Sequence, residues 1–110
     1  MPSEDRRIIF SSGEVYQALF ALCMQKQVEK PPPGRVMGIE ESAEDSQRIV
    51  LNLENPQAKE GALVTAEYSR DFLAAALLLF CKGLGIPIPK SGKKSVLVKD
   101  GQVMLRVQVG

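Results

Sequence analysis

The sequence contains no histidine and only two cysteines, and these absences remove much site chemistry before any motif is considered. Without histidine there is no Ser-His or Cys-His nucleophile pair, and most zinc chemistry is excluded. Cys23 and Cys81 have no Cys-x-x-Cys spacing, and each lies in an apolar helical pattern. We therefore expect two buried thiols that behave as small hydrophobic side chains in a reducing, cytoplasmic compartment.

Long apolar runs are missing as well. The longest, residues 72–81, has ten residues, which is about half of the ~20 that a transmembrane helix needs. The charged N-terminal residues are not followed by an apolar signal core. In a chain of 110 residues, 45% hydrophobic and 25% charged, these features predict one small soluble domain over residues 1–110, with no membrane contact.

A large net charge is also absent, because the formal value is +1. The net charge of the whole molecule therefore does not indicate binding to nucleic acid or to a membrane. The charge is unevenly distributed, however, since residues 38–60 carry a local net charge of −4, from six acids and two bases. Residues 82–106 carry +5, from six bases and one acid. The six bases are Lys82, Lys90, Lys93, Lys94, Lys99 and Arg106.

The N-terminal third is typical of a short strand followed by an amphipathic helix. Residues 8–10 form the apolar strand, and Ser11 and Glu14 have the spacing of a capping box at the start of the helix. The helix is predicted to run to about Gln27, and residues 31–34, three prolines and a glycine, then end it. Its apolar face comprises Val15, Ala18, Leu19, Leu22 and Cys23.

The middle of the chain has weaker signals. Residues 35–41 could form a strand that pairs with the better strand at residues 48–54, and an irregular acidic loop before a single strand is the open alternative. Residues 55–57 are predicted to close that strand. A second helix is predicted to begin at Thr65, because acidic residues favour a helix N-terminus, and to stop at Lys82-Gly83. Its centre is apolar all round, so we expect the sheet, the first helix or a second copy to cover it.

The clearest signal is a C-terminal β-hairpin turning at Asp100-Gly101, a two-residue turn of type I′. This turn places Val98 opposite Val103 and Leu97 opposite Met104. Alternation then sorts the hairpin into two faces. The predicted core face comprises Val96, Val98, Val103, Leu105, Val107 and Val109. The predicted outer face comprises Lys93, Ser95, Leu97, Lys99, Gln102, Met104, Arg106 and Gln108.

These elements together predict an α/β domain of the α+β type, a two-layer sandwich in the order β-α-(β)-β-α-β-β. Two helices are expected on one face of a mainly antiparallel sheet. We find no internal repeat in the sequence. Because this element order occurs in several unrelated small folds, it does not by itself indicate a function.

No motif specifies an enzyme. Residues 91–94 have the outline of a phosphate-binding loop, but Pro87 stands where the first glycine is needed and Lys94 where a hydroxyl is needed. The acidic residues 40–45 lack the spacing of a calcium loop, and no reaction geometry is evident in Glu67, Tyr68, Arg70 and Asp71. We therefore predict no catalytic residue, no cofactor and no metal.

Five basic residues are candidate contacts for an anion: Lys90, Lys93, Lys94, Lys99 and Arg106. We expect them to gather on or beside the outer face of the hairpin, with Leu97 and Met104 among them as candidate interaction residues. Lysines at a sheet edge also deter aggregation, a role that needs no ligand, and this interpretation stays open.

The sequence supports two main function hypotheses. The first is a non-enzymatic binding module that contacts an anionic partner, most simply RNA or DNA, through the basic C-terminal hairpin. The second is a protein-interaction or homodimerisation domain that uses the apolar helix or the outer sheet face. An enzyme is a third and weaker hypothesis, and the sequence indicates no pathway.

Overall fold

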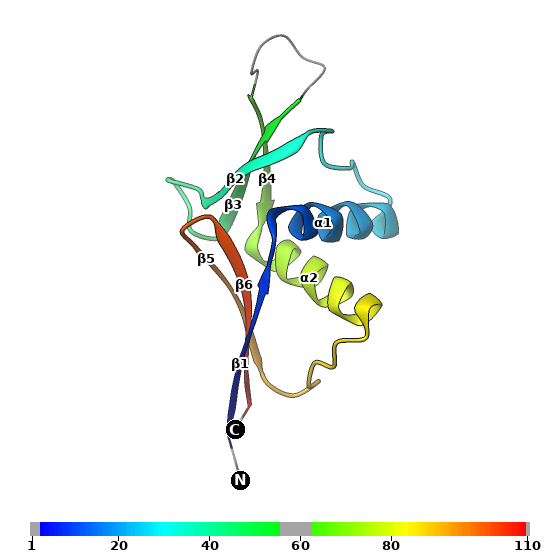
Figure 1. Ribbon diagram of the computed structural model, residues 1–110, viewed down its shortest axis with the longest axis vertical. Coiled ribbons are helices and arrows are strands. Elements are labelled where there is room, and N and C mark those ends of the chain that lie inside the picture. Colours follow the sequence, from blue (N-terminus) through cyan, green and yellow to red (C-terminus); the bar gives the residue numbers. More distant parts are fainter. Residues whose placement is uncertain (1–2, 56–62, 110) are drawn as a thin grey trace.

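The computed structural model describes residues 3–55 and 63–109 (Figure 1). Two helices pack against two three-stranded antiparallel sheets, which confirms the predicted fold class and its C-terminal hairpin. Both helices lie on the same side of the strands (Figure 1). Of the predicted strand end at 55–57, residues 56 and 57 lie outside the described residues. The elements are β1 (Glu4–Phe10), α1 (Ser12–Lys26), β2 (Arg35–Glu41), β3 (Arg48–Glu54), β4 (Leu63–Ser69), α2 (Arg70–Leu84), β5 (Lys93–Lys99) and β6 (Gln102–Val109).

The same unit of a strand, a helix and a hairpin occurs twice, as β1-α1-β2-β3 and then as β4-α2-β5-β6. The structure therefore contains a repeat of elements that the sequence analysis did not detect. From the N-cap of each helix to the glycine that ends its connector, equivalent positions lie 58 residues apart (residues 11–34 and 69–92). Such pairs are the helix N-caps Ser11 and Ser69, the buried thiols Cys23 and Cys81, and the left-handed C-caps Gln27 and Gly85.

Each half contributes its first strand to the hairpin of the other half. The sheets have the strand orders β1-β6-β5 and β2-β3-β4, so β1 pairs with β6 and β4 pairs with β3, in both cases antiparallel. Neither half can complete a three-stranded sheet alone. The two halves are thus interlocked, and one hydrophobic cluster draws its buried residues from both.

Both helices begin at a serine N-cap. A difference between the two caps explains why the sequence predicted the wrong start for α2. Ser11 forms the predicted capping box with Glu14. The side chain of Ser69 accepts a hydrogen bond from the backbone amide of Phe72 at 3.1 Å, but no Glu or Gln stands at this position to complete a box. The sequence signal is therefore weak, and α2 begins after Ser69 instead of at Thr65, which lies within β4.

The end of α2 also differs from the prediction. Gly83 remains helical, the helix ends at Leu84, and Gly85 takes the left-handed conformation with φ 75°. The expectation that α2 is covered nearly all round holds only partly, because Ala75 is exposed while Leu73 and Leu77 are fully buried.

Each helix returns to its hairpin through a connector, which we call the first connector (residues 27–34) and the second connector (residues 85–92). Both end in a glycine with positive φ, 149° at Gly34 and 134° at Gly92. A Cβ atom there would lie 2.8 Å from the carbonyl oxygen of Glu54 and 3.0 Å from that of Gln108, respectively. Both connectors therefore require glycine at this close approach to the last strand of their hairpin.

The core lies where the inner faces of the strands meet α1 and α2. The predicted face of α1 is buried as expected, and both cysteines are free and buried. Burial raises the pKa of the Cys23 and Cys81 thiols, so they act as hydrophobic side chains at neutral pH.

The predicted register of the C-terminal hairpin is confirmed, with Val98 opposite Val103 and Leu97 opposite Met104. Its inner face is buried at Val96, Val103, Leu105 and Val107 and half-buried at Val98 and Val109. The uncertain middle segment is also a hairpin, β2-β3, whose register shifts between Val36 and Gly38.

Candidate anion-binding sites

The outer face of the β1-β6-β5 sheet forms the first candidate site. The inner residues Val96, Leu105 and Phe10 are buried, so their neighbours along each strand point outward. The strand pairings arrange the outward residues in rows across the sheet. From one end to the other the rows are Asp5-Gln108-Lys93, Arg7-Arg106-Ser95, Ile9-Met104-Leu97 and Gln102-Lys99.

One cation of this face, Arg106, is neutralised by a carboxylate. Its Nε donates to one oxygen of Asp5 at 3.0 Å, and its terminal nitrogen donates to the other at 2.7 Å. This bidentate bond to Arg106 holds the pKa of Asp5 below its ordinary value. The guanidinium of Arg106 is therefore only partly available to a ligand.

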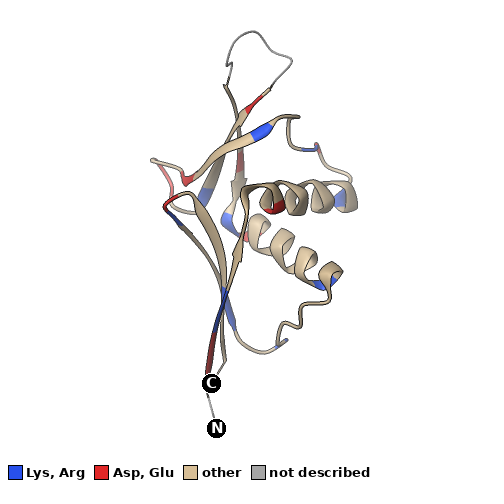
Figure 2. Ribbon diagram, viewed as in Figure 1, with Lys and Arg blue, Asp and Glu red and all other residues tan. Residues whose placement is uncertain are grey.

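Three other cations of this face are exposed: Arg7, Lys93 and Lys99. Within the described residues none of them forms an ion pair. They surround an apolar row in which Ile9 is 60% exposed and Leu97 and Met104 are half-buried. Besides the bond to Arg106, the charge of Arg7 helps to lower the pKa of Asp5. The arrangement presents positive charge outside ion pairs and exposed apolar surface together. Figure 2 marks the charged positions on the ribbon.

Lys90 and Lys94 do not lie on this face itself, whereas Lys93, Lys99 and Arg106 do. Lys94 lies one residue from Lys93 on β5 and therefore points to the opposite side of the sheet, toward the helices. Lys90 lies in the second connector. The five candidates thus separate into an outer group, Lys93, Lys99 and Arg106, and an inner pair.

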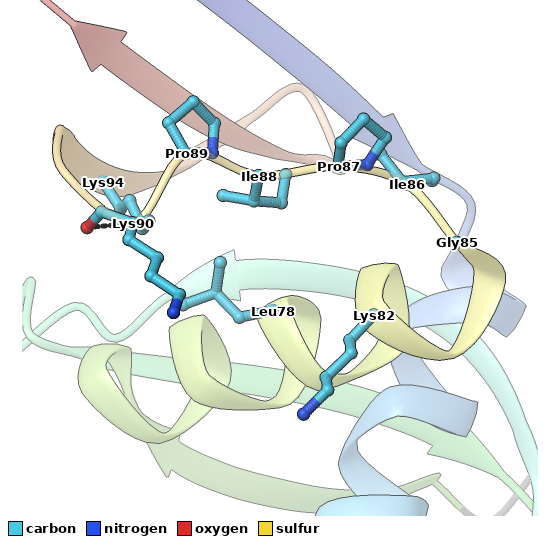
Figure 3. A pocket seen from close by; sticks show the side chains of 9 residues that line it. All are labelled: Leu78, Lys82, Gly85, Ile86, Pro87, Ile88, Pro89, Lys90 and Lys94. Carbon is cyan, nitrogen blue, oxygen red and sulfur yellow. Dashed lines mark hydrogen bonds between the residues drawn. The ribbon is translucent and has the colours of Figure 1, made fainter.

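The inner pair borders a cleft of about 510 Å³ between α2 and the second connector (Figure 3). Lys90 reaches across the cleft toward Leu78, while Lys82 extends along α2 with its ammonium group directed away from the connector. The Nζ of Lys94 donates to the carbonyl oxygen of Lys90 at 3.2 Å. Apolar side chains and backbone complete the lining: Leu78, Gly85, Ile86, Pro87, Ile88 and Pro89.

The polar residues around the start of α2 have structural contacts. Tyr68 stacks on Phe72 with ring centroids 5.6 Å apart, and burial raises the pKa of Tyr68 to about 12. The phenol therefore stays protonated at neutral pH. Arg70 joins the two sheets, because its guanidinium donates to Glu41 on β2 and to the backbone oxygen of Val96 on β5.

Sequence reasoning missed Arg7 and Lys82 as site residues. Arg7 belongs to β1, whose pairing with β6 joins the two ends of the chain. In the sequence, the alternation of Asp5, Arg7 and Ile9 indicates that these residues share one face of a strand. Only the pairing of β1 with β6 places that face beside the C-terminal hairpin.

In the part of the chain that the structure describes, no group of three acidic or cysteine residues could hold a metal ion. No helix there is long and apolar enough to cross a membrane. Comparison with known protein families, curated proteins and solved structures finds no match.

Proposed function

We propose that the chain is a non-enzymatic binding module that holds a single strand of RNA or DNA on the outer face of the β1-β6-β5 sheet. The observation that carries this proposal is the exposed apolar row Ile9-Met104-Leu97 among three cations without an ion pair in the described chain. Unneutralised lysines and arginines supply phosphate contacts, and exposed apolar side chains offer a surface to unstacked bases.

The spacing of the cations suits an extended ligand. Lys93 and Lys99 lie at opposite ends of β5, about 20 Å apart at the usual rise of a strand. Arg7 lies on β1, across the sheet from both. A polymer with repeated phosphates can contact all three cations, whereas a single small anion can contact only one end of the face.

A single strand suits this face better than a duplex. The apolar row offers nothing to a phosphate backbone, and a duplex keeps its bases stacked inside. The face has no aromatic residue, so we expect modest affinity with little sequence preference, since base stacking on aromatic rings is the usual source of strong binding to single strands.

Titration of labelled single- and double-stranded oligonucleotides at several salt concentrations tests the proposal. With three phosphate contacts the logarithm of the binding constant should fall with the logarithm of salt with a slope of about −2 for a single strand. The K93E/K99E variant should bind at least about tenfold more weakly, with a smaller slope.

Arg35→Glu is the matched control. Arg35 occupies the position on β2 that is equivalent to Lys93 on β5, and its side chain is 75% exposed. It belongs to the other sheet, so R35E should leave oligonucleotide binding unchanged. Absence of binding at low salt, or equal losses in R35E and K93E/K99E, would contradict the proposal.

A second candidate function, self-association through the helices, has its own observation. A hollow of about 420 Å³ lies between α1 and α2, and one of about 350 Å³ lies on α1 beside it. Leu84 in the first and Met24 in the second are 58% and 54% exposed. A second copy could bury this apolar surface. Sedimentation over a concentration series separates the candidates, because a monomer throughout excludes this one and leaves nucleic-acid binding untouched.

A further inference from the structure

We propose that the cleft between α2 and the second connector is a separate binding site for a small organic anion with an apolar body, such as a fatty carboxylate. Its volume, about 510 Å³, lies within the range of ligand sites in proteins, about 300 to 1,000 Å³. This site goes beyond the proposed function, because it uses the opposite side of β5 and none of the outward-facing cations.

The lining of the cleft matches the two parts of such a ligand. Leu78 on α2 and Ile88 on the connector face the cavity (Figure 3), and the two prolines extend the apolar wall. Lys94 bonds the backbone of Lys90 at one end of the cleft, and the Lys90 side chain extends from there toward Leu78 (Figure 3). Among the residues that the structure describes, no acidic side chain lines the cleft. An anionic head can therefore meet the ammonium groups while an apolar body covers Leu78 and Ile88.

The repeat explains why this cleft is open. In the first half, the equivalents of Ala74 and Leu78 are Tyr16 and Phe20. The hydroxyl of Tyr16 donates to the carbonyl oxygen of Pro32 on the first connector at 3.0 Å. Phe20 lies under the ammonium of Lys30, which is 5.6 Å from the ring centroid. These aromatic rings contact the first connector, and the hollow beside Tyr16 and Gly34 holds about 240 Å³, less than half the volume of the cleft that Leu78 lines in the second half.

The wall formed by the second connector is held in place before any ligand binds. The amide of Ile86 donates to the carbonyl oxygen of Cys81 at 2.9 Å, and a guanidinium nitrogen of Arg6 donates to that of Pro87 at 2.9 Å. Pro87 and Pro89 restrict the backbone further. A preformed wall lowers the ordering cost of binding.

Amide chemical shifts of the folded chain, titrated with octanoate below its micelle concentration, test the proposal. Octanoate should shift amides of α2 and the second connector, among them Leu78, Ile86 and Ile88. The neutral analogue 1-octanol should bind at least about tenfold more weakly, since it lacks the charge-assisted bonds to lysine. Octyl phosphate should bind at the same place, because the lysines recognise negative charge without a fixed geometry.

Two variants localise the site. K90Q/K94Q should weaken octanoate binding about tenfold and leave 1-octanol unchanged. Leu78→Phe copies Phe20 of the first half, places a larger ring at the lining of the cleft and should weaken binding of both probes. The control K93Q/K99Q removes two lysines from the outer face and should retain octanoate binding. The proposal for this cleft and the proposal for oligonucleotide binding can therefore be contradicted independently. The spectrum of each variant reports whether it is folded.

Each alternative outcome overturns the proposal. Equal affinity for octanoate and 1-octanol would mean that the lysines do not recognise the head group. Shifts confined to the helix hollows or the outer sheet face would place the probe elsewhere. Binding to anionic lipid vesicles without any octanoate-induced shift would assign Lys90 and Lys94 to a membrane surface instead of a ligand cleft.

Discussion

The two sheets have equivalent strand orders, but corresponding inner rows of their outer faces carry opposite chemistry. On the β2-β3-β4 sheet this row is Glu40-Val50-Glu67, and on the β1-β6-β5 sheet it is Leu97-Met104-Ile9. Two carboxylates in one sheet thus correspond to two apolar side chains in the other. The repeat preserves the fold, and the difference between its copies indicates which surface is available to an anionic or apolar partner.

The cations of the two faces differ in the same way. On the β2-β3-β4 sheet, Arg48 pairs with Glu67 at 2.9 Å and Arg35 pairs with Glu54 at 3.6 Å. Within residues 3–55 and 63–109, both cations of that face therefore have a carboxylate partner. Among the described residues of the β1-β6-β5 face, only Arg106 is paired. A face with internally paired charges gains little from an external phosphate, because the ligand must compete with the carboxylate already present.

The largest effect is expected from the equivalent core residues Leu19 on α1 and Leu77 on α2, both fully buried. Leu19→Ala and Leu77→Ala should each lower the free energy of unfolding by about 2 to 5 kcal/mol, through lost burial and a cavity between the helices. Because each half completes the other's sheet, each variant should unfold in a single transition. Urea denaturation followed by circular dichroism measures both quantities.

Comparison of Leu19→Ala with Leu77→Ala tests whether the two halves unfold as one unit. If the halves folded independently, Leu77→Ala would lower the midpoint of only part of the transition, and the curve would separate into two steps. The exposed substitution Gln25→Ala on α1 controls for general effects of mutation in a helix, and it should change stability little.

The sequence predicted those features that depend on local chemistry. The Asp100-Gly101 turn determines the hairpin register, because both positions take positive φ, 52° and 75°. The capping box at Ser11 likewise placed α1 correctly. Both signals involve residues only a few positions apart, so the turn and the helix start can be predicted from the sequence alone.

Features that depend on distant partners were not predictable. The strand β4 was mistaken for the start of a helix, since Thr65 and nearby acids imitate a helix N-terminus and its pairing with β3 is not visible in the sequence. The bond between Asp5 and Arg106 joins residues 101 positions apart. Sequence spacing therefore identified the cations of the outer group but not which of them is neutralised.

The smallest expected effect is a gain of binding at the outer face. Asp5→Asn removes the carboxylate that pairs with Arg106 and so frees a fourth cation. Single-stranded oligonucleotides should then bind a few-fold more tightly, and the salt slope should become steeper by about 0.7, the value for one added phosphate contact. Glu4→Gln is the control, because Glu4 precedes Asp5 on β1 but points to the other side, where it lies 3.7 Å from Arg6.

The pH dependence of this gain separates ion-pair release from a simple change in net charge. The pKa of Asp5 is lowered in the folded state, so the pair with Arg106 is intact at neutral pH. Its contribution to stability is lost only as the pH falls through that lowered pKa. Protonation of Asp5 then frees Arg106 in the wild-type chain too, and the advantage of Asp5→Asn should disappear. An advantage that persisted at acid pH would mean that Asp5 repels the ligand by some route other than its bond to Arg106.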